Sequence, residues 1–165
     1  MAEAICDTSP LQYLHQIKHL DVLPSLATRV LVPPAVVDEL QEGMRLGLDL
    51  PDVNTLDWVE VLRPAGASAL PLVTDLGPGE SEALALALEY REAVIVLDDR
   101  VARNVARTLG LKMTGTLSLL LDAKRAGRIE RVTPLLNELE SLGFRLADHT
   151  RAAVMKLAGE VEQAR

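Results

Sequence analysis

The chain has 165 residues with 48% hydrophobic content, which is enough for a single domain with a real core. Its net charge of −7 argues against a protein that coats DNA, and an aromatic content of 2% argues against base stacking as the main binding mode. One cysteine excludes a disulfide framework and fits the cytoplasm, while no apolar run reaches the ~20 residues of a membrane span and no signal peptide is recognisable.

The first part of the chain predicts three strands with helices between them. Ala4–Cys6 is a short apolar run that ends in Asp7, and Thr8, Ser9 and a helix follow it. Val30–Val32 is a second such run, stopped by two prolines, after which a helix carries an apolar stripe from Val36 to Met44. Trp58–Leu62 alternates between apolar and polar residues and predicts a third strand.

The central stretch, Leu76–Gly110, predicts a helix, a strand and a second helix. The first helix starts after a Gly-Pro-Gly break and is apolar on all sides over Ala83–Leu88, which is typical of a buried helix. Ala93–Leu97 reads as a strand covered on both faces, and it ends in two aspartates. Val101, Val105 and Leu109 then recur at helical spacing.

The last part of the chain predicts one more strand, at Leu111–Met113, and three helices that begin near Thr116, Thr133 and Asp148. Residues Arg63–Asp75 are expected to form a loop, and the tail Glu160–Arg165 is expected to fray. Strands that alternate with helices predict an α/β fold of three layers, α/β/α, around a parallel sheet of about four to five strands. We expect a single domain over residues 1–165, with 146–165 as a C-terminal helical extension.

Several acidic residues are predicted to meet at one edge of this sheet. Three of them follow strands, and two lie on helices next to the sheet: Asp7, Asp98, Asp99, Glu39 and Glu80. The carboxyl ends of parallel strands share one edge, which is where α/β proteins place their sites. Hard divalent cations prefer oxygen ligands, and converging carboxylates repel one another unless a cation lies between them. The pattern therefore favours a site for a hard divalent cation such as Mg²⁺, suited to phosphodiester hydrolysis.

Each of these acids also has a purely structural interpretation. Asp7 or Glu80 can cap a helix or complement its dipole, and one of the two aspartates after the fourth strand can cap the next helix. Glu39 taken alone is more often a solvated helical residue. Only their joint placement favours a site.

A row of arginines follows the aspartate pair on the predicted helix, at Arg100, Arg103 and Arg107. The spacing places them along one helix face. They form either a rail for a phosphate backbone or a solvated face paired with Glu89 or Glu92, and the sequence leaves the two interpretations open.

Five motifs in this order resemble the PIN-domain nucleases, and more narrowly the DUF3368 branch of PIN-like proteins. The resemblance covers nearly the whole chain, and its motifs are Ile5-Cys6-Asp7-Thr8-Ser9-Pro10-Leu11, Leu31-Val32-Pro33-Pro34-Ala35-Val36-Val37-Asp38-Glu39-Leu40, Gly79-Glu80-Ser81-Glu82-Ala83, Val96-Leu97-Asp98-Asp99-Arg100 with Arg103, and Thr114-Gly115-Thr116.

The resemblance implies a parallel sheet between helices, with three or four acids that bind Mg²⁺ or Mn²⁺. By this resemblance Asp7, Glu39 and Glu80 are the first three acids, and Asp98 or Asp99 is the fourth. Many toxin PIN domains have a Thr, one variable residue and an Asp there, an alignment that favours Asp99 as the acid nearer the metal. Hydroxyls that support the carboxylates or touch phosphate would come from Thr8, Ser9 and Thr116, and phosphate contacts from Arg100 and Arg103.

These observations predict a metal-dependent endoribonuclease, with the toxin role of a toxin–antitoxin pair as a further expectation. The partners expected are RNA, a small antitoxin protein and a second copy of the chain in a homodimer, with no membrane. One alternative is a PIN fold that binds RNA or protein with little turnover. Another is a receiver-like signalling domain, which the position of Glu39 and the lack of a suitable late lysine disfavour.

Overall fold

The computed structural model describes residues 2–66 and 76–160. Its sheet has five parallel strands in the order β3-β2-β1-β4-β5. The strands are β1 (Ala4–Cys6), β2 (Val30–Val32), β3 (Val59–Val61), β4 (Val94–Val96) and β5 (Met113–Thr114). The chain order changes direction at β1, which lies between β2 and β4, so the residues that follow these three strands meet at one place on the sheet edge.

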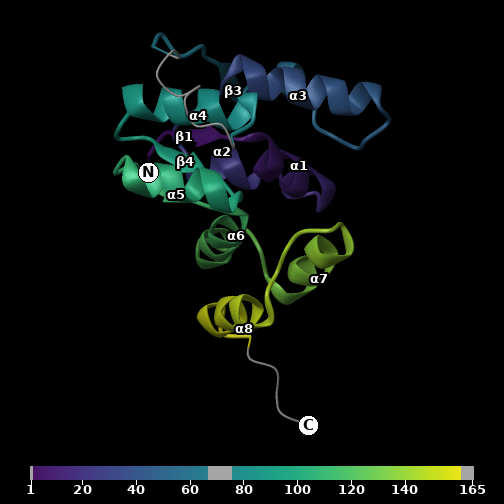
Figure 1. Cartoon of the computed structure of the whole chain (residues 1–165). Coiled ribbons are helices and arrows are strands. Elements are labelled where there is room, and N and C mark those ends of the chain that lie inside the picture. Colours follow the sequence, from purple (N-terminus) through teal and green to yellow (C-terminus); the bar gives the residue numbers. More distant parts are fainter. Residues whose placement is uncertain (1, 67–75, 161–165) are drawn as a thin grey trace.

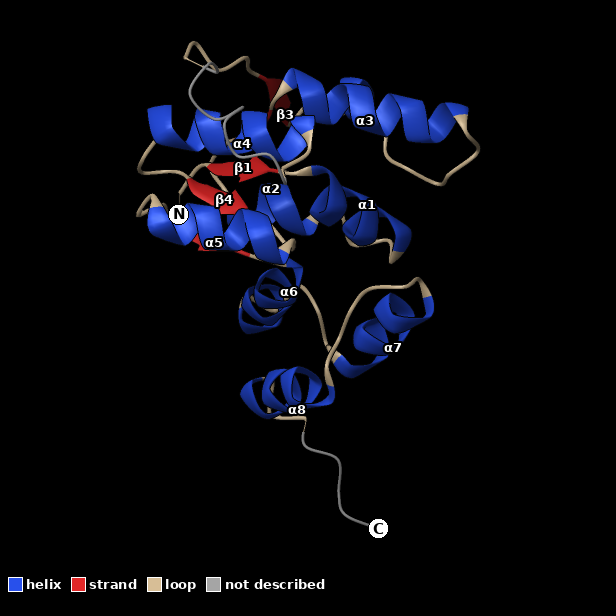
Figure 2. Cartoon of the chain, in the orientation of Figure 1, coloured by secondary structure: helices blue, strands red, loops and turns tan. Residues whose placement is uncertain are grey.

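Helices follow the strands in the predicted alternation, with a short 3₁₀ helix, η1, before β3. Their bounds are α1 (Thr8–Gln16), α2 (Val22–Leu26), α3 (Pro34–Arg45), η1 (Val53–Thr55), α4 (Pro78–Glu89), α5 (Arg100–Thr108), α6 (Thr116–Arg125), α7 (Thr133–Ser141) and α8 (Asp148–Leu157). The strands lie in the interior, with helices around them (Figure 2). The predicted three-layer α/β/α fold is confirmed.

Alternate residues of the central strands bury into two different cores, as the period of two in a strand requires. Ala4 and Cys6 face the core formed with α1, α2, α3 and the last three helices, whereas Ile5 faces the core formed with α4 and α5. Ala83–Ala87 on α4 is buried throughout, as its all-round apolar sequence predicts. Both faces of the sheet are therefore covered, which explains why β1 carries no polar residue (Figure 1).

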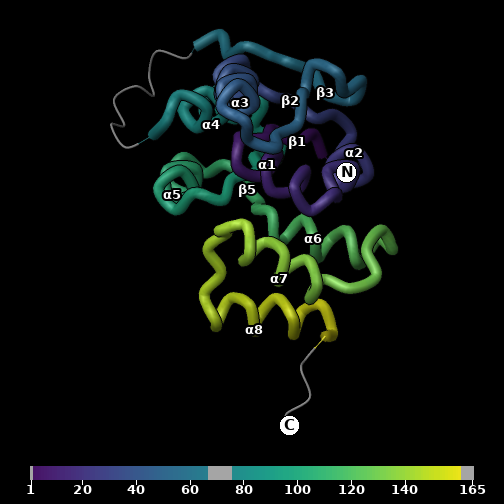
Figure 3. The backbone as a smooth tube through the Cα atoms, turned by 90° about the vertical axis from the view of Figure 1, so that its right-hand side faces the viewer, coloured from purple at the N-terminus to yellow at the C-terminus, as the bar shows by residue number. Residues whose placement is uncertain are grey.

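The last three helices lie together on one side of the sheet in both views (Figures 1 and 3). Buried residues on all three, including Leu120, Leu136 and Val154, belong to the same core as Cys6 and Val96. The predicted helices of this segment are thus present, and α8 packs against α6. No described helix has the length and apolar character that crossing a membrane demands.

Three expectations need correction or lie outside the structure. Of the predicted row on α5, Val105 and Leu109 are half-buried and pack against the core, but Val101 is 39% exposed, and the fully buried residues of this helix are Ala102 and Ala106. Glu160 does not fray: its side chain is 6% exposed and held by hydrogen bonds. The predicted loop Arg63–Asp75 falls mostly on residues 67–75, which lie outside the described residues, as does 161–165.

Candidate metal-binding active site

Asp7 is the most deeply buried acid at the carboxyl edge of the sheet. It follows β1 directly, and only 2% of its surface is exposed. It occupies the N-cap position of α1, but its side chain makes no capping hydrogen bond there. Its Oδ1 atom is buried without any hydrogen-bond partner among the described residues. An unpaired buried carboxylate oxygen is costly, so the helix-cap interpretation does not account for Asp7.

The surroundings of Asp7 favour its protonated form. Burial raises the pKa of Asp7 to about 7; the Thr8 amide works against this, and the nearby charges of Glu80, Glu39 and Asp98 add to it. The groups that shift this pKa thus include three other carboxylates. A bound cation would reduce the repulsion between these buried carboxylates.

Glu39 joins three elements at this edge. It lies half-buried on α3, its Oε2 accepts a hydrogen bond from Thr8 Oγ1 at the start of α1, and its Oε1 accepts one from Gly79 N on α4 at 2.9 Å. A Cβ atom on Gly79 would stand 2.5 Å from Glu39 Oε2, so only glycine leaves room for this carboxylate. Glu39 is therefore not a solvated helical residue.

Glu80 has both of its predicted roles. Its Oε2 accepts from Gly77 N at 3.4 Å, which satisfies one donor at the start of α4. Burial first, and then the charges of Asp99 and Glu39, raise the pKa of Glu80 against that hydrogen bond. Glu80 thus stands among the acids of the sheet edge while it supports the helix start.

Asp98 and Asp99 have different hydrogen-bond partners: Asp98 is bound by Thr116, and Asp99 caps a helix. Asp98 accepts hydrogen bonds from Thr116 N at 2.9 Å and from Thr116 Oγ1 at 2.6 Å, and burial raises its pKa although both of these bonds lower it. Asp99 caps α5, with its Oδ2 accepting from Ala102 N at 2.9 Å. The charge of Asp98 acts on Asp7, and that of Asp99 acts on Glu80, so both aspartates adjoin the cluster.

The arginine row of α5 separates into an inner and an outer part. Arg103 is half-buried, and its Nη1 donates to Leu97 O at 2.8 Å and to Thr114 O at 3.2 Å, which holds the guanidinium beside Asp98. Arg107 donates to Asn104 on its own helix, and Arg100 is exposed at the start of α5.

The glutamates expected to pair with this row are engaged elsewhere. Glu92 pairs with Lys112 at 2.7 Å, and Glu89 accepts from the amides of Ala65 and Gly66. Of the predicted hydroxyls, Thr8 and Thr116 hold Glu39 and Asp98, and Ser9 lies half-buried on the first turn of α1.

Comparison with protein families settles the relationship. The family model DUF3368, described as a PIN domain, matches residues 3–160. The chain belongs to this family. The predicted resemblance is confirmed, and PIN domains are in general nucleases.

Among the similar solved structures is a PilT N-terminus domain protein from the hyperthermophilic archaeon Sulfolobus solfataricus P2. It is 21% identical, with a TM-score of 0.45, over 78% of this chain and 95% of that one. Comparison with curated proteins gives no match.

The donor set of this PIN domain fits a hard divalent cation by its chemistry. It offers carboxylate oxygens, one of which, Asp7 Oδ1, is buried and unpaired. In the described part of the chain, however, no three His, Cys, Asp or Glu side chains stand close enough together to hold a metal as they are. The carboxylate of Glu39, held by Thr8 and Gly79, is one that would have to turn before it could act as a ligand.

Three residues that shape the site were not predicted as part of it. Gly79 makes room for Glu39, and Gly115 makes room for Asp98, whose Oδ1 would lie 3.0 Å from an added Cβ. Glu82 accepts from Ala35 N at the start of α3 and so ties α4 to the helix that carries Glu39. The available signals were the Gly-Pro-Gly break, which was interpreted as chain punctuation, and the Thr-Gly-Thr motif, which was used for the family resemblance and for Thr116 but not for its glycine.

Proposed function

We propose that this PIN domain is a Mg²⁺- or Mn²⁺-dependent endoribonuclease. The observation that carries the proposal is the buried, unpaired Oδ1 of Asp7, which lies among three other carboxylates at the sheet edge. Such a cluster opposes folding unless a cation offsets its charge, and its oxygens suit these two metals. The metal would supply an activated water and would stabilise negative charge on the phosphate.

The residues of the chain divide the remaining work. Asp7, Glu39, Glu80 and Asp98 would hold the metal. We prefer Asp98 to Asp99, which the family resemblance favoured as the acid nearer the metal, because Asp99 is exposed and caps α5, whereas the charge of Asp98 acts on Asp7. Asp99 would stand beside Glu80. Thr116 fixes the orientation of Asp98 through two hydrogen bonds, one from its amide and one from its hydroxyl. Arg103, whose Nη1 is held by two backbone carbonyls beside Asp98, would meet a phosphate oxygen of the substrate with its remaining N–H groups.

The test is cleavage of a fluorescent single-stranded RNA with Mg²⁺, with Mn²⁺ and with a chelator. Asp7→Asn should lower metal-dependent cleavage by about 100-fold or more, because even residues outside the ligand set cost 10- to 100-fold. Asp38→Asn is the matched control. Asp38 lies on α3 next to Glu39, but its side chain is exposed. Equal cleavage by wild type and Asp7→Asn, or cleavage that the chelator leaves intact, would contradict the proposal.

A second candidate is a PIN fold that binds RNA or a protein with little turnover. It is favoured by the engagement of both Glu39 oxygens, which Thr8 and Gly79 already occupy. RNA binding that needs no metal, without any metal-stimulated cleavage, would support this candidate. The toxin role, the small antitoxin, the homodimer and the cytoplasmic location stay predictions from the sequence.

A further inference from the structure

A pocket of about 360 Å³ opens beside the acid cluster, on the side of the last three helices. Its inner wall contains Asp98, Arg103 and Gly115 from the sheet edge, and its outer walls come from α6, α8 and the segment between α7 and α8. Its volume lies in the ~300–1,000 Å³ range of small-ligand sites. We call it the α6–α8 pocket.

Part of the lining of the α6–α8 pocket is apolar. Leu121 and Val154 line it as buried residues, while Leu157 lines it although 63% of its surface is exposed. Phe144 also lines it, and its ring is braced edge-on by Tyr13 at a centroid distance of 5.0 Å. An exposed leucine next to a braced phenylalanine offers apolar contact to a flat ligand.

The pocket is also lined by two arginines and two hydroxyl-bearing residues. Arg145 contributes an exposed guanidinium at the outer wall, and Arg103 contributes a fixed one at the inner wall beside Asp98. Ser118 and Thr150 add hydroxyls that can donate or accept. Apolar side chains together with two guanidinium groups, in a pocket that the carboxylate of Asp98 also lines, match a ligand with a flat ring and a phosphate.

We propose that the α6–α8 pocket binds the nucleoside adjacent to the phosphodiester that the acid cluster cleaves. The proposal rests on the proposed function, because it takes the acid edge as the place of the phosphate. Unpaired bases of RNA pack on aromatic side chains and on arginine guanidinium planes, and here Phe144 and Arg145 supply one of each. A base that enters this pocket must fit its walls, so the pocket limits which bases the enzyme accepts at one position of the RNA.

The experiment uses the full chain in Mg²⁺ buffer and records the methyl NMR signals of Leu121, Val154 and Leu157. Adenosine, cytidine, guanosine and uridine monophosphate are titrated in turn, with inorganic phosphate as the matched ligand without a base. At least one nucleotide should shift these signals saturably, while phosphate leaves them in place. Shifts no larger than those caused by phosphate, for all four nucleotides, would overturn the proposal.

Two leucine variants on α8 test the position. Ala153 lines the pocket, whereas its neighbour Ala152 does not, and both are exposed, so neither change disturbs the core. Ala153→Leu should weaken nucleotide binding by about tenfold, the equivalent of ~1.4 kcal/mol, within the range measured for one base contact. Ala152→Leu should stay within about twofold of wild type, and equal affinities for the two variants would contradict the pocket.

The titration separates this proposal from the proposed function, because a nucleoside monophosphate contains no phosphodiester to cleave. Nucleotide binding that Ala153→Leu weakens, in a protein that cleaves no RNA, would sink the nuclease and keep the pocket. Metal-dependent cleavage that Asp7→Asn abolishes, with no nucleotide effect on the pocket methyls, would support the nuclease and overturn the pocket proposal.

Discussion

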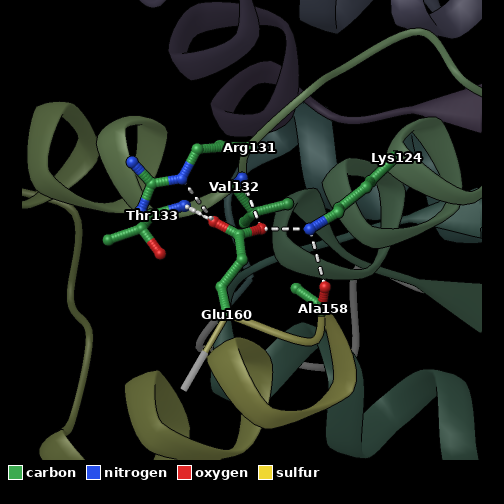
Figure 4. Close-up of polar contacts among 6 residues, drawn as sticks. All are labelled: Lys124, Arg131, Val132, Thr133, Ala158 and Glu160. Carbon is green, nitrogen blue, oxygen red and sulfur yellow. Dashed lines mark hydrogen bonds and ion pairs between the residues drawn. The ribbon is translucent and has the colours of Figure 1, made fainter. Parts of the chain in front are cut away.

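Asp7 and Glu160 are two shielded carboxylates in opposite situations. One Asp7 oxygen has no partner, the neighbouring charges are other acids, and the pKa is raised to about 7. Glu160 has a side chain that is 6% exposed, and it accepts hydrogen bonds from Lys124 Nζ at 2.7 Å, Val132 N at 2.8 Å and Thr133 N at 3.0 Å (Figure 4). Burial would raise its pKa, but these bonds outweigh burial and hold it at about 2.

The comparison separates a functional carboxylate from a structural one. Glu160 follows α8 and fastens it to the start of α7 and the end of α6, with these hydrogen-bond donors supplied by the protein itself (Figure 4). Asp7 Oδ1 has no such partner among the described residues, so the fold bears a cost that a ligand from outside can remove. Replacing each carboxylate by its amide should therefore change the free energy of unfolding in opposite directions: it should fall at Glu160 and, without metal, rise at Asp7.

The largest effect on stability is expected from Glu160→Gln. The change removes the charge that Lys124 faces, at a pair whose lysine is 25% exposed and whose glutamate is 6% exposed. Breaking a buried pair at one partner costs about 3 kcal/mol, and for a chain of this size each kcal/mol lowers Tm by roughly 2–4 °C. Thermal unfolding followed by circular dichroism measures the loss.

Glu138→Gln is the matched control for this variant. Glu138 is an exposed glutamate on α7, so the same change of charge should leave Tm within about 1 °C. A Glu160→Gln protein as stable as the control would show that the Glu160 hydrogen bonds do not hold the last helices together.

Metal should stabilise the wild-type chain by the next largest amount. A ligand that binds only the folded state at 100 times its dissociation constant adds about 2.7 kcal/mol. Mn²⁺ and Mg²⁺ should therefore raise Tm in wild type and in Glu160→Gln but not in Asp7→Asn. An equal rise in Asp7→Asn would place the metal away from the sheet edge.

Without metal, Asp7→Asn should make the protein more stable at neutral and alkaline pH. The pKa of Asp7 is raised from 3.8 to about 7, so the folded state binds a proton that the unfolded state releases, and its stability falls as pH rises through this window. The linkage limit is about 4 kcal/mol, and relaxation should leave a gain of about 2 kcal/mol above pH 7.

The same gain should shrink toward zero near pH 4, where Asp7 is protonated in the folded state and partly protonated in the unfolded one. Chemical unfolding at pH 4, 6 and 8 with a chelator measures this profile. A gain that does not change with pH would mean that asparagine stabilises by packing or hydrogen bonding and not by removing a buried charge.

The sequence predicted the fold and the acids because both follow from local patterns. Short apolar runs that end in an acid mark β1 and β4 in the sequence, whereas the strand order, with its change of direction at β1 that brings Asp7 and Asp98 to one edge, came from the structure. The buried face of α5 was found only in part: Val105 and Leu109 pack against the core as predicted, but the alanines Ala102 and Ala106, which are fully buried, carry too little hydropathy to stand out in the sequence.

Glu160 could not be found in this way. Its partners Lys124 and Val132 lie 36 and 28 residues earlier in the chain, and nothing near Glu160 in the sequence marks them. A terminal glutamate is most often solvated, so the local rule predicted a frayed tail. Contacts between distant residues decided its position, as they also decided the space that Gly79 leaves for Glu39.

Gly79→Ala should change stability less than the other variants do, and it should separate an effect on RNA cleavage from an effect on stability most clearly. The new Cβ would lie 2.5 Å from Glu39 Oε2, the mobile end of a side chain, so the carboxylate should turn aside while the helix gains up to ~1 kcal/mol in propensity. Unfolding free energy should then change by less than about 1 kcal/mol, whereas metal-dependent RNA cleavage should fall by about tenfold or more as Glu39 leaves its place. Denaturant unfolding and cleavage assays on the same preparation measure both. Unchanged cleavage would show that Glu39 works from a position other than the one between Thr8 and Gly79, and a large loss of stability would make this edge a structural element like the Glu160 contacts.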